Sequence, residues 1–118
     1  MTLIFKICGD AEWRKAQGEG VYRGSAVDER DGFIHFSTAE QLAETAAKHF
    51  AQRDDLLLIA VEAGALGEAL RFEPSRGGAL FPHLYGTLPL AAVRFVEAIP
   101  LGADGRHRLP PGERLSPS

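Results

Sequence analysis

Apolar residues, either continuous or alternating with charged ones, form five short runs that predict β-strands. The runs are residues 3–8, 33–36, 56–61, 70–73 and 92–99. Each is four to eight residues long and is bounded on at least one side by glycine, proline or a charged residue, as strands usually are. The third run reads LLLIAV and is apolar at every position, so we expect it to be buried on both faces at the centre of a sheet.

Two other stretches have apolar residues at helical spacing. The first covers residues 11 to about 17, with Asp10 as its N-cap and glycines closing it. The second covers residues 38–51. Ser37 and Thr38 each precede a glutamate or glutamine by three residues, which gives two overlapping capping boxes. The buried face of this second helix is expected to contain Ala39, Leu42, Ala43, Ala46, Ala47 and Phe50.

The order of these elements, β-α-β-α-β-β-β, predicts an α+β fold with mostly antiparallel strands and two or three helices. The 118 residues are enough for one domain, which we expect to span residues 1–109. Residues 21–32 show neither the helical nor the strand spacing of apolar residues and are expected to be irregular. The chain after Pro100 is rich in glycine, proline and charge, so it is expected to be largely unstructured, with a flexible tail at 110–118.

Composition and charge narrow the class of protein. The net charge is −3, with 16 acidic and 13 basic residues, so no basic surface for nucleic acid is expected. No apolar run approaches the roughly 20 residues that span a bilayer, and the N-terminus does not resemble a secretory signal. The single cysteine, Cys8, excludes an intrachain disulfide and favours a reducing, cytoplasmic location. Its apolar surroundings favour a core residue over a nucleophile.

The first candidate for chemistry is the stretch GFIHFST, residues 32–38. In a strand, Phe33 and His35 share one face, and His35 comes just before a helix start. A helix start carries unpaired N–H groups that can bind an anion or a carbonyl oxygen. The alternative is that His35 is half-buried and bonded to the backbone, while Ser37 and Thr38 serve only as helix caps.

The second candidate is RFEPSRGG, residues 71–78. Glu73 is expected to end a strand because Pro74 breaks it, which exposes the loop that follows. Ser75, Arg76 and two glycines then have the composition of a phosphate or carboxylate cradle. Loops of this composition also occur without a ligand.

The third candidate is GGALFPHLYG, which is too broken by glycine and proline to be one helix. Pro82 favours an extended chain, in which His83 and Tyr85 project on one side and Leu84 on the other, toward the core. Gly86 permits a turn. A rigid segment that displays imidazole and phenol together is expected to form one wall of a binding site, although both rings could instead simply pack.

Metal binding is a weaker alternative. The four histidines include no H-x-H or H-x-x-x-H spacing. His35 and His83 could meet across a sheet with Glu73 as a third ligand, which would suit a metal-assisted hydrolase. Nothing local specifies such a site, so no metal is expected.

Three strings together resemble a known family. They are IFKI with GDAEW near the start, DGFIHFSTAEQ in the middle, and EPSRGG with FPHLYG later. The chain resembles the small bacterial family called domain of unknown function 952 (DUF952), from Leu3 to about Leu109. That family is similar at the level of fold to the ADP-ribosyltransferase superfamily. The resemblance implies a split, mixed β-sheet flanked by helices, a nucleotide held between the sheet halves, and NAD as a possible cofactor.

The resemblance also implies roles for individual residues. In those enzymes a basic residue on the first strand holds the ribose or phosphate, a hydroxyl or aromatic group frames the nicotinamide, and a late glutamate stabilises the sugar cation. On this chain these roles would fall to Lys6, to Ser37 and Thr38 with His83 or Tyr85, and to Glu73. Many members of the family have histidine where this chain has lysine at the first-strand position.

We therefore expect a cleft that binds a nucleotide-like or phosphorylated small molecule. The candidate catalytic residues are His35, Glu73 and His83. The candidate ligand-binding residues are Lys6, Ser37, Thr38, Ser75, Arg76 and Tyr85. Three activities stay open: an ADP-ribosyl or phosphoryl transferase, a non-catalytic binding or interaction module on the same fold, and a metal-assisted hydrolase. The sequence does not specify an oligomeric state.

Overall fold

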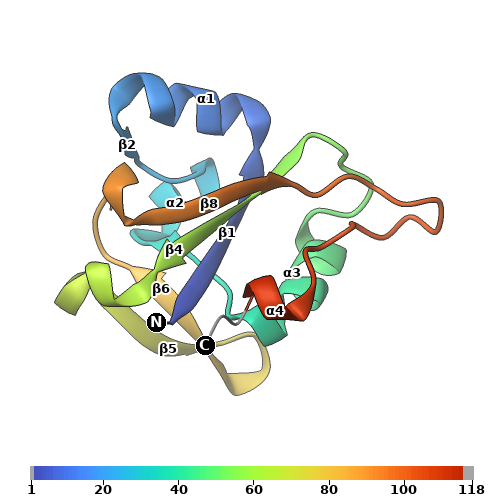
Figure 1. The fold of residues 1–118 in the computed structure, drawn as a ribbon. Coiled ribbons are helices and arrows are strands. Elements are labelled where there is room, and N and C mark those ends of the chain that lie inside the picture. The colour runs from blue at the N-terminus through green and yellow to red at the C-terminus, as the bar shows by residue number, and fades with distance from the viewer. Residues whose placement is uncertain (1, 116–118) are drawn as a thin grey trace.

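The computed structural model describes residues 2–115, except for the side chain of Arg76. Its centre is an antiparallel sheet of three strands in the order β1-β4-β8 (Figure 1). These strands are β1 (Leu3–Gly9), β4 (Leu56–Glu62) and β8 (Val93–Ala98). β4 pairs with both of the others, which confirms the central place predicted from its apolar sequence.

The remaining strands form two smaller sheets. They are β2 (Val21–Tyr22), β3 (Ile34–His35), β5 (Leu70–Ser75), β6 (Ala79–Leu84) and β7 (Leu88–Pro89). β2 pairs with β7, and β6 lies between β3 and β5. Every ladder among residues 2–115 is antiparallel. The structure therefore confirms an α+β fold with antiparallel sheets, whereas the expected mixed sheet has no parallel pair within that range.

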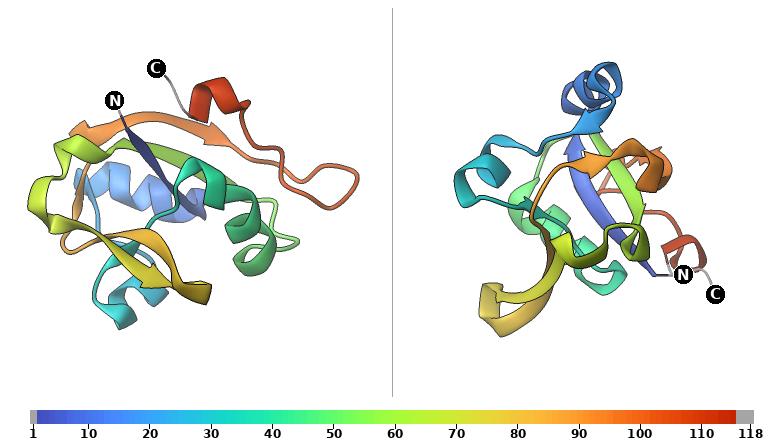
Figure 2. Two further views of the ribbon diagram at one scale, coloured as in Figure 1. Left: turned by 90° about the horizontal axis from the view of Figure 1, so that it is seen from below. Right: turned by 90° about the vertical axis from the view of Figure 1, so that its left-hand side faces the viewer.

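Four α-helices accompany the strands in the described part of the chain. They are α1 (Asp10–Glu19), α2 (Ala26–Asp31), α3 (Leu42–His49) and α4 (Gly112–Leu115). Five single 3₁₀ turns occur at Ala39–Gln41, Ala63–Ala65, Gly67–Ala69, Arg76–Gly78 and Leu90–Ala92. α2 and α4 lie at opposite sides of the molecule (Figure 2). No helix in this range is long and apolar enough to cross a membrane.

The central sheet is covered on both faces. On one face, Ile4 and Cys8 of β1 pack with Trp13 of α1. On the other, Phe5 of β1 packs with Leu42 of α3. Alternate residues of β1 therefore belong to different cores, as the period of a strand requires. One β1 residue on the α1 face is a buried lysine, which the candidate site explains.

Residues 21–32 contain β2 and α2, so the prediction of an irregular segment is wrong. α2 follows Ser25, whose Oγ accepts a hydrogen bond from the N–H of Asp28 (3.3 Å). It ends at Gly32, which has a φ of 87° and so suits glycine. Only one of its six residues is buried, and that residue is Asp28. A helix without an apolar face leaves no hydrophobic period in the sequence.

The predicted helix over 38–51 is confirmed in part. It begins as the 3₁₀ turn and continues as α3, with Leu42 and Ala46 buried. Ala43 and Ala47 are exposed, contrary to the prediction. A helix this short presents only a narrow stripe to the sheet, and these two alanines lie outside it.

Two boundaries also differ from the prediction. Gly9 is the N-cap of α1, so Asp10 is the first helical residue instead of the cap. β5 continues through Pro74, which is paired with Leu80 of β6, so the strand does not end at Glu73. β5 is an edge strand, where the N–H that proline lacks is not needed for the ladder.

The chain after Pro100 has more structure than expected. Leu101 forms a bridge with His107, and the N–H of Leu101 donates to Asp54 Oδ1 at 2.8 Å. His107 Nε2 lies 2.8 Å from the carbonyl oxygen of Arg53. These polar contacts hold the segment against the turn before β4, and α4 follows. Within the predicted flexible tail, residues 116–118 lie outside the described residues.

Candidate functional site

Two histidines predicted to line a site face each other on neighbouring strands. His35 of β3 is paired with His83 of β6, and their ring centroids are 5.5 Å apart. Arg71 of β5 is paired with His83 on the other side. Because directly paired residues project from the same face of a sheet, the three side chains form a row across β3, β6 and β5. Strand register thus brings together residues that are distant in the sequence.

Glu73 holds the imidazole of His83. Glu73 Oε1 lies 2.8 Å from His83 Nδ1 and accepts a hydrogen bond of 2.8 Å from Tyr85 Oη. The bonds with His83 and then Tyr85 hold the pKa of Glu73 below its usual range, and the same contact raises the pKa of Tyr85. With the carboxylate at Nδ1, the other ring nitrogen of His83 is left as an acceptor. His83 of β6 and Tyr85, which follows that strand, therefore project on one side, as predicted.

Asp28 of α2 holds the second histidine. Its Oδ1 lies 2.6 Å from His35 Nδ1 and accepts the backbone N–H of His35 at 3.1 Å. Its Oδ2 lies 2.7 Å from Lys6 Nζ and accepts the N–H of Ser25 at 2.8 Å. Burial by itself would raise the pKa of Asp28, but the hydrogen bonds from His35 and the charge of Lys6 hold it well below its usual range. Lys6 and Asp28 are 6% and 2% exposed, so this is a buried ion pair.

α2 supplies a second carboxylate to His35. Asp31 Oδ2 lies 3.1 Å from His35 Nε2, so each ring nitrogen of His35 has a carboxylate oxygen within hydrogen-bond distance. An imidazole can donate at both nitrogens only as the imidazolium. The two histidines thus differ, because His83 has a carboxylate at one nitrogen and His35 has one at each.

Aromatic rings complete the surface. The ring of Phe33 stacks on His83 with centroids 4.1 Å apart, and it lies 4.6 Å from the ring of His35 and 5.2 Å from that of Tyr85. The guanidinium carbon of Arg71 lies 5.1 Å from the centre of the Tyr85 ring. We call this surface the histidine face, and its members are Phe33, His35, Arg71, Glu73, His83 and Tyr85. Tyr85 is 39% exposed and His83 is 5% exposed, so solvent reaches the rim more than the centre.

Four predicted site residues do not join the histidine face through any described contact. Ser37 Oγ lies 2.9 Å from Thr45 Oγ1 of α3, and Thr38 is the N-cap of the 3₁₀ turn before that helix. Ser75 lies at the turn end of β5, about 13 Å along the strand from the row of histidines at about 3.3 Å per residue. The side chain of Arg76 lies outside the described residues. The fold therefore directs the Ser37 hydroxyl toward α3.

Residues 7–96, well over half of the chain, match the family described as "Protein of unknown function (DUF952)". The chain belongs to the DUF952 family. This confirms the family predicted from its three sequence strings, and it adds no activity, because the description of the family states none.

Solved structures resemble this DUF952 chain along almost its whole length. The crystal structure of protein CC0527 from Caulobacter crescentus is 52% identical, with a TM-score of 0.90, and the match covers 97% of this chain and 98% of that one. The solution NMR structure of CC0527 is also 52% identical, with a TM-score of 0.84 and coverage of 98% and 97%. A search of curated proteins gave no match.

The sequence prediction for this DUF952 protein missed Asp28. Ser25 and Asp28 have the spacing of a capping box with an acid in the third position, and the structure has both of its hydrogen bonds. That spacing could have predicted the start of α2. It could not have predicted the ion pair with Lys6, which lies 22 residues away in the sequence.

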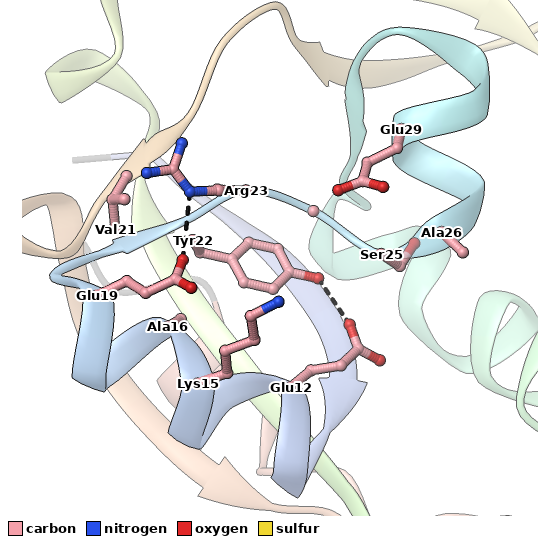
Figure 3. A pocket seen from close by; sticks show the side chains of 11 residues that line it. Glu12, Lys15, Ala16, Glu19, Val21, Tyr22, Arg23, Ser25, Ala26 and Glu29 are labelled. Carbon is pink, nitrogen blue, oxygen red and sulfur yellow. Dashed lines mark hydrogen bonds and ion pairs between the residues drawn. The ribbon is translucent and has the colours of Figure 1, made fainter.

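A pocket of about 420 Å³ lies between α1 and α2 (Figure 3). Its charged lining residues are Glu12, Lys15, Glu19, Arg23 and Glu29. Several polar groups already have partners there, since Arg23 Nε pairs with Glu19 at 3.2 Å and Tyr22 Oη donates to Glu12 at 3.1 Å. None of the predicted site residues lines this pocket. The histidine face, which holds the two histidines paired with carboxylates, is therefore the better candidate site.

Two other kinds of chemistry find little support in the described residues. Between residues 2 and 115, no group of three or more His, Cys, Asp or Glu side chains is arranged to hold a metal ion. Cys8 is buried, and this burial, followed by the charge of Glu12, raises the pKa of its thiol to about 12. A thiol with so high a pKa is a poor nucleophile at neutral pH, which agrees with a core role for Cys8.

Proposed function

We propose that the histidine face binds a phosphorylated or nucleotide-like small molecule. The observation that carries this proposal is that one surface holds both aromatic rings and a charged hydrogen-bond donor. Phe33 and Tyr85 offer rings on which a planar base can stack, a contact worth about 1–3 kcal/mol per base. Arg71 offers a guanidinium that forms charge-assisted hydrogen bonds with phosphate oxygens.

The two histidines also suit acid–base chemistry. His83 has a carboxylate at Nδ1, which leaves Nε2 to accept a proton. His35 has carboxylates at both nitrogens, so it can give a proton to a ligand only where the ligand displaces Asp31 from Nε2. With rings 5.5 Å apart, one histidine can take a proton from an attacking hydroxyl while the other gives a proton to the leaving oxygen. Phosphoryl transfer is the reaction that this pair supports best.

ADP-ribosyl transfer is a second candidate, because Glu73 is a half-buried carboxylate on the same face. After nicotinamide leaves NAD, such a carboxylate would stabilise the sugar cation. Glu73 already accepts bonds from His83 and Tyr85, which favours a role as the partner of His83 over direct contact with a sugar. Release of nicotinamide from NAD, measured by chromatography, separates the two reactions.

The binding proposal is tested by titrating the protein with AMP, ADP-ribose and NAD while recording its melting temperature and its NMR spectrum. A ligand at about 100 times its dissociation constant should stabilise the fold by about 2.7 kcal/mol. We expect the amide signals of Phe33, Arg71 and Tyr85 to shift. Replacing Arg71 by alanine should weaken binding about tenfold or more, which is the effect of losing one hydrogen bond to a charged group.

The matched control is Arg94→Ala. Arg94 is an exposed arginine of β8 in the central sheet, so this change removes the same charge away from the histidine face. It should leave the affinity unchanged. Equal losses in the two variants would indicate non-specific attraction, and the absence of binding by any of the three ligands would contradict the proposal. Binding without turnover of phosphate or nicotinamide would instead identify a non-catalytic binding module.

A further inference from the structure

The groups around Asp28 are those that proteins use to bind a phosphate. Each of its carboxylate oxygens has two donors. Lys6 Nζ and the N–H of Ser25 lie 2.7 and 2.8 Å from Oδ2. His35 Nδ1 and the N–H of His35 lie 2.6 and 3.1 Å from Oδ1. An ammonium, an imidazole and two backbone N–H groups that converge on one point form an anion-binding site. In this structure the anion is a side chain of the protein itself.

Besides Asp28, the helix that carries this anion is held by Asp31, whose Oδ2 lies 3.1 Å from His35 Nε2. Asp28 is the one buried side chain of α2, and its neighbour Val27 is 48% exposed. The helix is flanked by Gly24 and Gly32, with φ of 102° and 87°, a region that glycine enters without the cost other residues meet. The pocket between α1 and α2 leaves the flank of α2 toward α1 unpacked (Figure 3). Release of the Asp28 and Asp31 carboxylates would therefore free α2 without exposing an apolar core.

We propose that Asp28 occupies a phosphate subsite of the histidine face, and that the phosphoryl group of a ligand takes its place as α2 swings outward on Gly24 and Gly32. This inference rests on the proposed function, because His35 belongs both to the subsite and to the histidine face. A phosphate monoester carries more negative charge than a carboxylate and offers three oxygens to the donors that stay in place, which are Lys6 Nζ, His35 Nδ1 and the N–H of His35, whereas Ser25 moves with α2. Lys6 would then contact the ligand, although it is buried beneath α2 in the closed form.

Competition of this kind has a measurable signature. While Asp28 fills the subsite, the apparent affinity for phosphate is lowered by the fraction of molecules in which the subsite is open. Asp28→Asn keeps the shape of the side chain but removes its charge, so the internal competitor becomes weak. We expect the affinity for phosphate to rise about tenfold or more. A tenfold rise corresponds to a subsite that Asp28 fills about 90% of the time in the wild type.

The experiment measures binding of inorganic phosphate and of AMP to the wild type, to Asp28→Asn and to Glu29→Gln. Glu29 is an exposed residue of the same helix with no contact to Lys6 or His35, so its replacement matches the change in net charge. We expect both ligands to bind Asp28→Asn more tightly than wild type, and Glu29→Gln to bind like wild type. A folded Asp28→Asn variant with unchanged affinity for both would overturn the inference, as would equal gains in both variants.

A measurement on the wild type keeps the test decisive if Asp28→Asn does not fold. The N–H of His35 in β3 donates to Asp28 of α2, so this bond breaks when α2 swings out. The His35 amide should then exchange with deuterium at a protection far below that of Ile59 in the central strand. Exchange of both amides only by global unfolding would overturn the inference.

The outcomes also separate this inference from the proposed function. If wild-type protein binds AMP at Phe33 and Tyr85 and Asp28→Asn binds it no more tightly, the proposed function stands and the phosphate subsite is rejected. Tighter binding of inorganic phosphate alone by Asp28→Asn supports a subsite for free phosphate and rejects the stacking of a base. No binding of either ligand by either protein rejects both.

Discussion

At the scale of single residues, Glu73 links His83 of β6 to Tyr85, which follows that strand. Its Oε1 lies at hydrogen-bond distance from both His83 and Tyr85. The contacts with His83 and then Tyr85 lower the pKa of Glu73 because each hydrogen bond favours the ionised carboxylate. The same geometry fixes which nitrogen of His83 is protonated, so the orientation of a candidate catalytic ring depends on one carboxylate oxygen.

This dependence can be tested with Tyr85→Phe. The variant removes one donor from Glu73, so the pKa of Glu73 should rise toward its usual value while remaining lowered by His83. The change is measured by NMR titration of the side-chain carboxyl carbon. Tyr22→Phe is the control, since Tyr22 donates to Glu12 and should leave Glu73 unaffected. An unchanged pKa of Glu73 in Tyr85→Phe would mean that the phenol does not donate to it in solution.

At the scale of elements, α2 depends on a close approach between Gly24 and Asp28. A Cβ on Gly24 would lie 2.8 Å from the Cβ of Asp28, whereas one on Gly32 would have no atom within 4 Å. Both glycines have positive φ, so alanine at either costs about 1–2 kcal/mol in backbone strain. Gly24→Ala should also push Asp28 away from Lys6, and breaking a buried ion pair costs about 3–5 kcal/mol.

We therefore expect Gly24→Ala to lower the free energy of unfolding by about 3 kcal/mol more than Gly32→Ala. Urea denaturation measures both variants, and the strain term cancels in the comparison. The amide signal of His35 should move in Gly24→Ala alone, because that N–H donates to Asp28. Equal losses of stability would show that backbone strain, and not the position of Asp28, holds α2.

The sequence predicted elements well where burial is apolar and poorly where it is polar. β4 could be predicted because every position of LLLIAV is apolar, and its central place follows from burial on both faces. α2 could not, because the side chain it buries is a carboxylate and its partner, Lys6, comes from a distant strand. Polar burial depends on tertiary neighbours, which leave no local period.

The same distinction applies to the candidate site. His83 and Tyr85 could be placed on one side of an extended segment because alternation along a strand is a local rule. The pairing of His35 with His83 depends on the register of β3 against β6, which the sequence does not fix. The hydrogen-bond partner of Ser37 could not be predicted for the same reason. Its hydroxyl had a local explanation as a cap, but in the fold it bonds to Thr45 of α3.

At the scale of the whole molecule, the buried Asp28 couples the stability of the fold to acid. Its pKa in the folded protein lies well below the ordinary 3.8, so its ionised form is stabilised by folding. A lowered pKa contributes stability that is fully present above the ordinary value and is lost as the pH falls toward the pKa of the folded state.

The variant Asp28→Asn has no such ionisable group. The wild type should therefore exceed it in free energy of unfolding by about 3 kcal/mol at neutral pH, and the difference should shrink below about pH 4. Urea denaturation of both proteins at about pH 7, 5 and 3 measures this difference, with Glu29→Gln as a control that should follow the wild type. A gap that stays constant down to about pH 3 would mean that folding does not lower the pKa of Asp28, and that its ion pair with Lys6 adds no pH-dependent stability.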